Sequence, residues 1–164
     1  MGFYARRIVP RLVELTCGQA GLVRFRVAAM EGLSGRVLEL GFGSGANVAH
    51  YPTAVTEVAA VEPSELAWEM SAKRRSERDI PIERVGLDGA SIDLDDNSCD
   101  AALVTFALCT IPYPDRALAE AARILRPGGR IHLLEHGISP DEGVARWQRR
   151  IDPIERRIAD GCEL

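Results

Sequence analysis

The segment VLELGFGSGA, residues 37–46, combines a glycine-rich turn with a carboxylate. Three glycines alternate directly behind an apolar run: Gly41, Gly43 and Gly45. The spacing satisfies the G-x-G-x-x-A pattern of dinucleotide-binding turns, in which a pyrophosphate lies at the N-terminus of the following helix. The carboxylate of Glu39, two positions before the first glycine, would repel both phosphates, and the turn supplies no cation. The segment therefore disfavours a pyrophosphate ligand.

A ligand with a cationic head and no phosphate suits the same residues. S-adenosylmethionine carries an ammonium, a carboxylate and a sulfonium. Glu39 would pair with the ammonium, and the glycines would let the backbone approach the ligand closely. Backbone N–H groups at the start of the following helix would receive the carboxylate. The pattern predicts S-adenosylmethionine as the cofactor, with S-adenosylhomocysteine as the product left after methyl transfer.

Two more acids follow the next two expected strands. Glu62 ends the segment VAAVEP, 17 residues after Gly45, where an acid accepts hydrogen bonds from both ribose hydroxyls. NAD has the same ribose, so Glu62 leaves an NAD-dependent oxidoreductase open. Asp88 in LDGAS would accept from the adenine amino group. Each acid alone is equally a solvated residue or a turn former, but their order after successive strands favours an adenosyl-binding site.

Strand-like and helix-like segments alternate from residue 36 onward, which predicts an α/β fold. We expect a Rossmann-like, doubly wound, mostly parallel sheet with helices on both faces. Its ligand should lie at the carboxyl ends of the strands, where the strand order reverses. The expected strands are 36–41, 55–63, 82–88, 99–108 and 130–136, and the expected helices are 3–15, 20–31, 46–51, 64–77 and 114–125.

The chain of 164 residues has room for a single domain. Within residues 1–164 we expect an N-terminal helical lid region at 1–34, a cofactor-binding core at 35–137 and a C-terminal basic helical segment at 138–164. Pro10 should interrupt the first helix and Pro153 the last.

Composition excludes some partners and indicates a compartment. The formal net charge of −4 gives no general attraction to nucleic acid, so we expect none as a partner. Arginine supplies nearly all basic residues, since Lys73 is the only lysine, which is typical of a GC-rich, bacterial genome. No secretory signal or membrane-length apolar run is present, which favours a cytoplasmic protein. The four cysteines show no metal-ligand spacing, so we expect no metal: Cys17, Cys99, Cys109 and Cys162.

Successive motifs resemble those of class I S-adenosylmethionine-dependent methyltransferases. The stretches are VLELGFGSGAN, VEPS, GLDGASIDLDDNSCDAALVTFALCTIP and ALAEAARILRPGGRIHLLEHG, within residues 36–137. In that superfamily, LCTIP, EHG, ARWQ, DP and the terminal DGC resemble the methyltransferase-like thiol S-methyltransferases and ubiquinone-biosynthesis-type methyltransferases. The resemblance implies methyl transfer to a small-molecule acceptor, a thiol or an apolar quinone-like compound.

The resemblance also assigns cofactor-binding residues. They map to Glu39, Gly41, Phe42, Gly43, Gly45, Glu62, Pro63, Asp88 and Gly89, with Thr105 and Ala107 facing the cofactor after the fourth strand. Phe42 replaces the usual Cys or Ala and should narrow the mouth of the site. Family members continue beyond the GC motif with a further helix and an antiparallel strand pair, whereas this sequence stops at Leu164. An uncovered sheet edge would favour a homodimer, and a non-catalytic cofactor-binding or partner module stays an alternative.

Methyl transfer from a sulfonium requires alignment more than a strong base. His136, at the end of the fifth expected strand, is the best candidate for a general base, although a structural histidine explains it equally well. The segment TIPY at 110–113 lacks the side-chain carbonyl used by amino-group methyltransferases of nucleic acids. In the tail, Trp147 and Ile151 lie on an apolar stripe flanked by arginines, which would suit peripheral membrane contact or packing on the protein.

Overall fold

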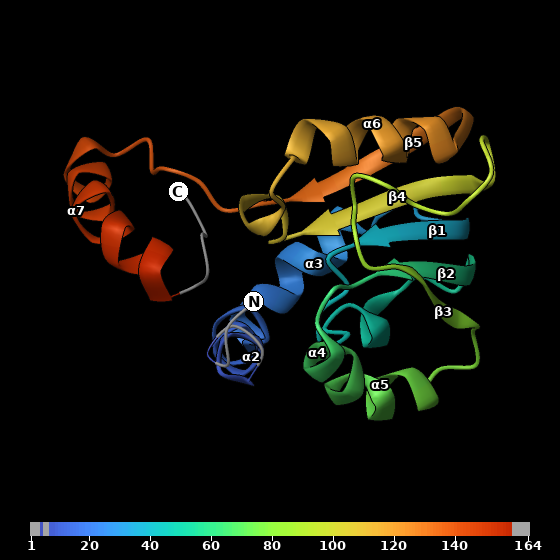
Figure 1. Ribbon diagram of the computed structural model, residues 1–164, viewed down its shortest axis with the longest axis horizontal. Coiled ribbons are helices and arrows are strands. Elements are labelled where there is room, and N and C mark those ends of the chain that lie inside the picture. The colour runs from blue at the N-terminus through green and yellow to red at the C-terminus, as the bar shows by residue number, and fades with distance from the viewer. Residues whose placement is uncertain (1–3, 5–6, 159–164) are drawn as a thin grey trace.

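The computed structural model describes residue 4 and residues 7–158. Its centre is a five-stranded sheet in the order β3-β2-β1-β4-β5, with every neighbouring pair parallel (Figure 1). The strands are β1 Gly35–Leu40, β2 Val55–Val61, β3 Ile82–Gly86, β4 Cys99–Thr105 and β5 Leu125–Leu134. The expected Rossmann-like parallel sheet is confirmed.

The strand order reverses between β1 and β4. The chain runs outward from β1 through β2 to β3 and then returns to place β4 on the other side of β1. The last residue of β1, Leu40, pairs with Val104 near the end of β4. The turns that follow β1 and β4 are therefore neighbours at the carboxyl edge, where open α/β sheets bind ligands.

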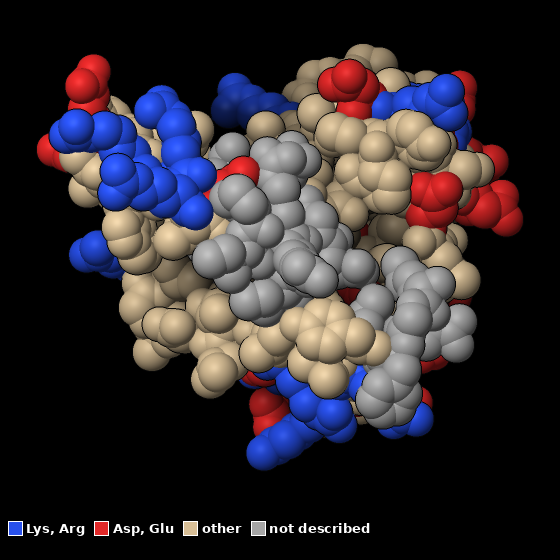
Figure 2. Space-filling view, turned by 60° about the vertical axis from the view of Figure 1, so that its left-hand side comes forward, with Lys and Arg blue, Asp and Glu red and all other residues tan. Residues whose placement is uncertain are grey.

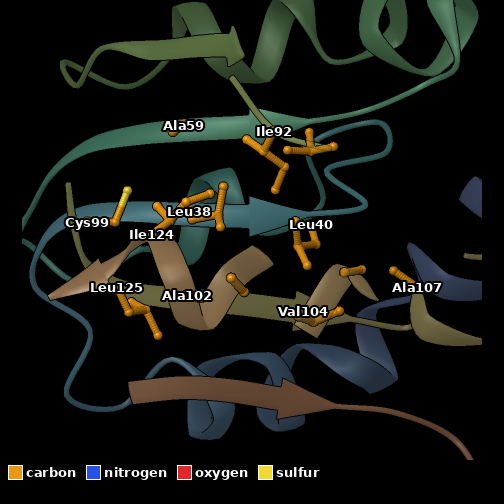
Figure 3. Close-up of a cluster of buried hydrophobic side chains, with 13 residues drawn as sticks. Leu38, Leu40, Ala59, Ile92, Cys99, Ala102, Val104, Ala107, Ile124 and Leu125 are labelled. Carbon is orange, nitrogen blue, oxygen red and sulfur yellow. The ribbon is translucent and has the colours of Figure 1, made fainter. Parts of the chain in front are cut away.

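Alternate residues of the strands enter two separate cores. Leu38 and Leu40 of β1 join Ala102 and Val104 of β4 beneath helix α6, Pro114–Ile124 (Figure 3). Val37 and Leu103 point to the other face, where Met30 and Leu33, just after helix α3 (Val23–Ala29), cover them. Burial on both faces is what the apolar sequences of β1 and β4 require.

The first two crossovers are less helical than expected. The predicted helix 46–51 is only the 3₁₀ turn η2, Val48–His50, because Tyr51 precedes a proline and adopts an extended conformation. The predicted helix 64–77 is divided into α4, Glu65–Met70, and α5, Ala72–Ser76. At the break, the Ser71 hydroxyl donates to the Trp68 carbonyl at 2.6 Å, a local bond that competes with the helix.

Strand β5 begins five residues earlier than the expected strand 130–136. Helix α6 ends at Ile124, and β5 begins at the next residue. Pro127 cannot donate to the ladder, and the register jumps from Leu125 to Arg130, so the Pro-Gly-Gly segment bulges out. Regular pairing from Arg130 onward agrees with the expected strand 130–136, but β5 ends at Leu134. Another 3₁₀ turn, η3 Leu108–Thr110, precedes α6.

Helical segments flank the sheet at both ends of the chain. Before it lie α2 (Val9–Cys17), the 3₁₀ turn η1 (Ala20–Leu22) and α3. Arg7 is helical, Ile8 forms a turn and α2 begins at Val9, so the helix expected at 3–15 is interrupted just before Pro10. Pro10 itself lies in the first turn of α2, where a proline is tolerated. Helix α7, Glu142–Ile158, stands away from the sheet (Figure 1) and continues through Pro153, which therefore costs a hydrogen bond without ending the helix. In the described part of the chain, no helix has both the length and the apolarity to cross a membrane.

Candidate cofactor site

The glycine turn after β1 requires glycine at its first position. Gly41, Gly43 and Gly45 have φ angles of +70°, +60° and +77°, which favour glycine. A Cβ atom on Gly41 would overlap the Cβ of Ala107, which follows β4. The backbone of Gly41 therefore packs directly against the Ala107 side chain, and the absence of a Cβ on Gly41 permits this contact.

Glu62, immediately after β2, holds the glycine turn in place. The residue is 6% exposed, and its carboxylate accepts from the backbone N–H groups of Gly43 and Ser64, each at 2.7 Å. Burial raises the pKa of Glu62, while the two backbone donors act in the opposite direction. Each carboxylate oxygen keeps an acceptor position beyond the backbone bond. The expected ribose acceptor is thus oriented by the glycine turn itself.

Glu39 lies beneath the turn and is 1% exposed. One of its carboxylate oxygens accepts from the Tyr51 hydroxyl, and the other accepts from the Asn47 amide at 2.9 Å. Burial raises the pKa of Glu39 to about 7. In this arrangement the carboxylate fixes the Asn47 amide, so the predicted pairing of Glu39 with a ligand ammonium stays a prediction.

Asn47 belongs to a buried polar network with Thr105 and Arg26. Its amide nitrogen donates to the Thr105 hydroxyl at 3.0 Å, and its carbonyl accepts from Arg26 Nη1 at 2.8 Å. Arg26 Nη1 also donates to the Thr105 hydroxyl at 3.0 Å. The network joins α3, the glycine turn and the end of β4, which lie far apart in the sequence.

A cavity of about 50 Å³ opens onto this network. Its walls come from α2, α3, the glycine turn and the segment after β4, and the lining residues include Val13, Cys17, Arg26, Gly41, Phe42, Gly43, Asn47, Thr105 and Phe106. This volume is smaller than the roughly 300 Å³ or more of typical small-molecule pockets. We call the helices on one side of the cavity the α2–α3 cover (residues 9–29).

A cluster of polar contacts fastens that cover to the glycine turn. Glu14 of α2 accepts from Ser44 Oγ and from Arg74 Nη2, the latter at 2.6 Å. Arg74 Nη1 donates to the Ser44 carbonyl at 2.9 Å. The guanidinium of Arg74 and its hydrogen bond lower the pKa of Glu14, so the carboxylate is ionised at neutral pH. We call this cluster the Glu14–Arg74 latch.

The structure brings only some of the predicted site residues to the cavity. Gly41, Phe42, Gly43 and Thr105 line it, while Gly45 and Ala107 pack directly behind. Phe42 is 3% exposed, and its ring packs against Trp68 at 5.4 Å, so much of its bulk lies in the core.

Glu39 and Glu62 do not line the cavity either, but each is bonded to a residue that does, Asn47 and Gly43 respectively. The remaining predicted residues lie away from the cavity walls. Asp88 is exposed, and its side chain accepts from the backbone N–H of Ala90 at 2.9 Å, as a turn former does. Gly89 and Pro63 are its counterparts in lying outside the lining, and His136 is exposed two residues beyond β5.

Three participants were not expected from the sequence: Arg26, Asn47 and Tyr51. Asn47 and Tyr51 follow the glycine turn closely, and a polar residue directly after such a turn was the available signal. Glu135 accepts from the backbone N–H groups of Ala107 and Leu108 at 3.0 and 3.1 Å, so it positions the segment after β4. Arg26 carried no local signal, because its partners lie on other elements.

The residues present fit an adenosyl ligand with an amino-acid head. Glu62 offers paired acceptors for a ribose, and the glycine turn leaves open backbone beside it. Among the described residues, no group of three histidine, cysteine or acidic side chains could hold a metal ion. Fold and site together define a Rossmann-like domain whose glycine turn and buried acid at the strand reversal fit an adenosyl ligand.

Comparison with known proteins identifies the family. The Methyltransferase domain family matches residues 38–133. Thiol S-methyltransferase TMT1B of Rattus norvegicus is 34% identical over 145 residues, covering 85% of this chain and 59% of its own length. Demethylmenaquinone methyltransferase of Clavibacter sepedonicus is 34% identical, covering 68% of this chain and 45% of its own length. The chain therefore belongs to the methyltransferase domain family and spans 59% and 45% of the lengths of these two relatives.

A solved structure agrees. The SAM-dependent methyltransferase of Thermotoga maritima, described as a possible histamine N-methyltransferase, is 25% identical and has a TM-score of 0.67. It covers 96% of this chain and 72% of its own. The predicted family and its cofactor, S-adenosylmethionine, are confirmed, and the comparisons favour a methyltransferase over the NAD-dependent alternative.

Proposed function

We propose that this protein transfers the methyl group of S-adenosylmethionine to a small-molecule acceptor. The observation that carries the proposal is the buried Glu62 carboxylate bonded to the glycine turn at the strand reversal, in a chain of the methyltransferase family. The acceptor is a thiol or an apolar quinone-like compound. The names of two relatives, a thiol S-methyltransferase and a demethylmenaquinone methyltransferase, support these two classes.

We propose the following roles for residues that follow successive strands of the sheet. Glu62 accepts from the ribose hydroxyls, Asp88 and Gly89 border the adenine, and the open backbone of the glycine turn faces the amino-acid head. Thr105 and Ala107 limit the site on the β4 side. When bound, the cofactor supplies an electrophilic methyl group on a good leaving group. The protein aligns the acceptor with that methyl group and excludes water beneath the α2–α3 cover.

A thiol acceptor needs little help from a base, because part of it is thiolate near neutral pH. For acceptors with a hydroxyl group we assign the general base to His136, whose exposed side chain follows the end of β5 at the carboxyl edge of the sheet. Replacing His136 with Ala should then slow methylation of a hydroxyl acceptor by ~10²-fold or more and leave a thiol acceptor nearly unaffected.

We also place the protein in a bacterial cytoplasm, with no nucleic-acid partner.

Helix α7 carries exposed Arg146, Arg149 and Arg150 beside Trp147, which is 62% exposed. On the face of the molecule drawn in Figure 2, basic side chains gather at the upper left. Such a helix suits contact with an anionic membrane surface. Binding of the protein to anionic but not neutral lipid vesicles, reduced by high salt, tests this contact.

The primary test is thermal unfolding with S-adenosylmethionine, S-adenosylhomocysteine and NAD in parallel. A ligand at ~100-fold excess over its dissociation constant stabilises the fold by ~2.7 kcal/mol, a readable shift for a domain of this size. We expect stabilisation by the two sulfur ligands only, and its loss in Glu62→Ala. Glu65→Ala, three residues away on the exposed side of α4, is the control.

The outcomes separate the alternatives. Stabilisation by NAD alone would contradict the proposal in favour of an oxidoreductase. Stabilisation by S-adenosylmethionine without formation of S-adenosylhomocysteine in the presence of thiol and quinone-like acceptors would support a non-catalytic module. Product formation with one acceptor class would identify the reaction.

A further inference from the structure

Phe106 has a strained backbone at the wall of the cavity. The residue directly follows β4 and has a φ of +53°, in the left-handed region that is unfavourable for a bulky side chain. Among the described residues, the other non-glycine residue of positive φ is Asn97, whose short polar side chain tolerates this conformation. Strained residues persist only where neighbouring contacts enforce them, and they gather at functional sites. The conformation of Phe106 therefore requires a contact that enforces it.

The end of strand β5 supplies that contact. Three consecutive N–H groups after β4 all donate to it. The Phe106 N–H donates to the Leu134 carbonyl at 2.8 Å. The N–H groups of Ala107 and Leu108 both donate to Glu135 Oε1, at 3.0 and 3.1 Å. Successive N–H groups around a left-handed residue form a concave site that favours an anion, and the Glu135 carboxylate fills this one.

The ring of Phe106 lies at the cavity and beside a buried cation. Phe106 and Arg26 both line the cavity, and the guanidinium carbon of Arg26 is 5.2 Å from the centre of the ring. The backbone that Glu135 holds therefore sets the place of an apolar ring in the cavity wall.

The order of the strands places Phe106 on the acceptor side of the site. Glu62, the proposed ribose acceptor, follows β2, and His136, the proposed general base, lies beyond the end of β5. In the sheet, β1 and β4 lie between these two strands (Figure 1). An acceptor aligned between the cofactor and His136 must then lie over the end of β4, beside Phe106.

We propose that Phe106 forms a wall of the acceptor site and that Glu135 is a positioning residue that holds it there, an inference that rests on the proposed function. Glu135 keeps the segment after β4 in the conformation that brings the Phe106 ring to the cavity. Without the carboxylate, the segment relaxes to an unstrained backbone and the ring leaves the wall. Alignment of the acceptor is then lost, while the glycine turn and Glu62 keep their contacts.

The test is a double-mutant cycle, because a positioning residue acts only through its target. Glu135→Ala, Phe106→Ala and the double variant are compared with the wild type for kcat/KM toward each acceptor that the wild type methylates, benzenethiol or hydroquinone. Isothermal titration gives the Kd of S-adenosylmethionine for the same variants. Glu135→Gln is added because its side-chain oxygen can still accept from two N–H groups.

Two variants outside the cavity lining are the controls. Glu120→Ala removes another partly buried carboxylate that accepts from a backbone N–H, that of Ile92 at 3.2 Å. Phe25→Ala removes another ring beside an arginine, with the guanidinium carbon of Arg24 at 4.5 Å from its centre. Circular dichroism establishes that each variant is folded, and Phe106→Leu replaces Phe106→Ala in the cycle if the smaller side chain prevents folding.

We expect Glu135→Ala and Phe106→Ala each to lower kcat/KM by ~10- to 100-fold, the effect of a misaligned acceptor, with the Kd of S-adenosylmethionine unchanged. The double variant should be no slower than Phe106→Ala alone. Glu135→Gln should retain most of the wild-type kcat/KM, and both controls should retain all of it.

Two results would overturn the inference and leave the proposed function standing. They are losses that multiply in the double variant and weaker binding of S-adenosylmethionine to Glu135→Ala. Absence of product from the folded wild-type chain with both acceptors would overturn the inference together with the proposed function.

Discussion

Glu39, in β1, and Glu62, directly after the neighbouring strand β2, are buried carboxylates. Glu62 meets the glycine turn from β2 through two backbone donors, whereas Glu39 meets side chains only, those of Tyr51 and Asn47. Desolvation raises the pKa of both groups. At the scale of single residues, the site therefore depends on a few buried groups whose protonation is linked to folding.

The raised pKa of Glu39 predicts a pH-dependent contribution to stability. Its folded pKa of about 7 lies above the ordinary value of 4.5, so the native state binds the proton more tightly. The contribution is full below pH 4.5 and is lost as the pH rises through about 7. Relative to Glu39→Gln, the wild-type free energy of unfolding should fall by about 3 kcal/mol between acidic and mildly alkaline pH.

Urea unfolding across that range measures the difference. Glu69→Gln, an exposed position on α4, is the control and should run parallel to the wild type. A constant difference between wild type and Glu39→Gln at every pH would show that the pKa of Glu39 is the same in the folded and unfolded states.

We predict a larger cost for replacing Gly41 than for replacing Gly32, although both glycines have positive φ. Gly41→Ala combines a φ of +70° with overlap against the Ala107 side chain, and we expect a loss of about 2–4 kcal/mol. Gly32→Ala has a φ of +84° but nothing within 4 Å, so only the backbone strain of ~1 kcal/mol should remain. Equal losses in the two variants would contradict a close approach of the turns, and Ala107→Gly should partly rescue Gly41→Ala.

At the scale of elements, the site is made where four segments converge. The turns after β1 and β4 line the cavity together with α2 and α3, and Glu62 after β2 bonds to the glycine turn from outside the lining. The cover is held partly by the core, through Met30 and Leu33 after α3, and partly by polar contacts from α2. The α2 portion is fastened to the glycine turn by polar contacts, so we expect it to be the part that opens.

The Glu14–Arg74 latch predicts how that opening responds to mutation. Arg74→Gln should increase hydrogen exchange in α2, Val9–Cys17, by several-fold. The reason is that the partly exposed Arg74–Glu14 ion pair contributes on the order of 1 kcal/mol or less to holding the helix. Cofactor release should accelerate in parallel. Lys73→Gln is the control, since Lys73 is exposed and faces Glu77 at 3.8 Å. Unchanged exchange in α2 would show that the core contacts alone hold the cover.

At the scale of the whole molecule, the edge strands β3 and β5 each pair with only one strand among the described residues. β5 pairs with β4 and is the last strand in the order, and Leu133 on it is 51% exposed. An open, apolar edge strand favours pairing with another chain. The predicted homodimer would place this edge at its interface.

Sedimentation velocity over a range of concentrations tests that arrangement. We expect reversible dimer formation, shifted toward monomer by Leu133→Lys, because a charge on an edge strand opposes pairing. Leu15→Lys, on α2 at 69% exposure, should leave the equilibrium unchanged. A monomer at all concentrations would exclude the edge as a dimer interface.

The sequence by itself determined the parts of the protein that local patterns specify. Apolar runs fixed the strands, the glycine turn after β1 and the acid after β2 marked the carboxyl edge, and the order of these motifs indicated the family. Such features can be predicted locally, because the apolar pattern of a strand and the conformation of a glycine turn are set by a few consecutive residues. The helix boundaries were less determined, since Ser71 and Pro52 altered the crossovers locally.

Only the tertiary structure decided how the buried charges are arranged. Arg26 donates to Thr105, 79 positions away, and Ser44 donates to Glu14, 30 positions away. Neither pair has a signature in the sequence, because each forms only when the sheet brings β1 and β4 together and the N-terminal helices fold across their ends. The same folding buries Glu39 behind Asn47 and Tyr51 and leaves Arg26 beside the cavity, since desolvation depends on packing from several elements at once.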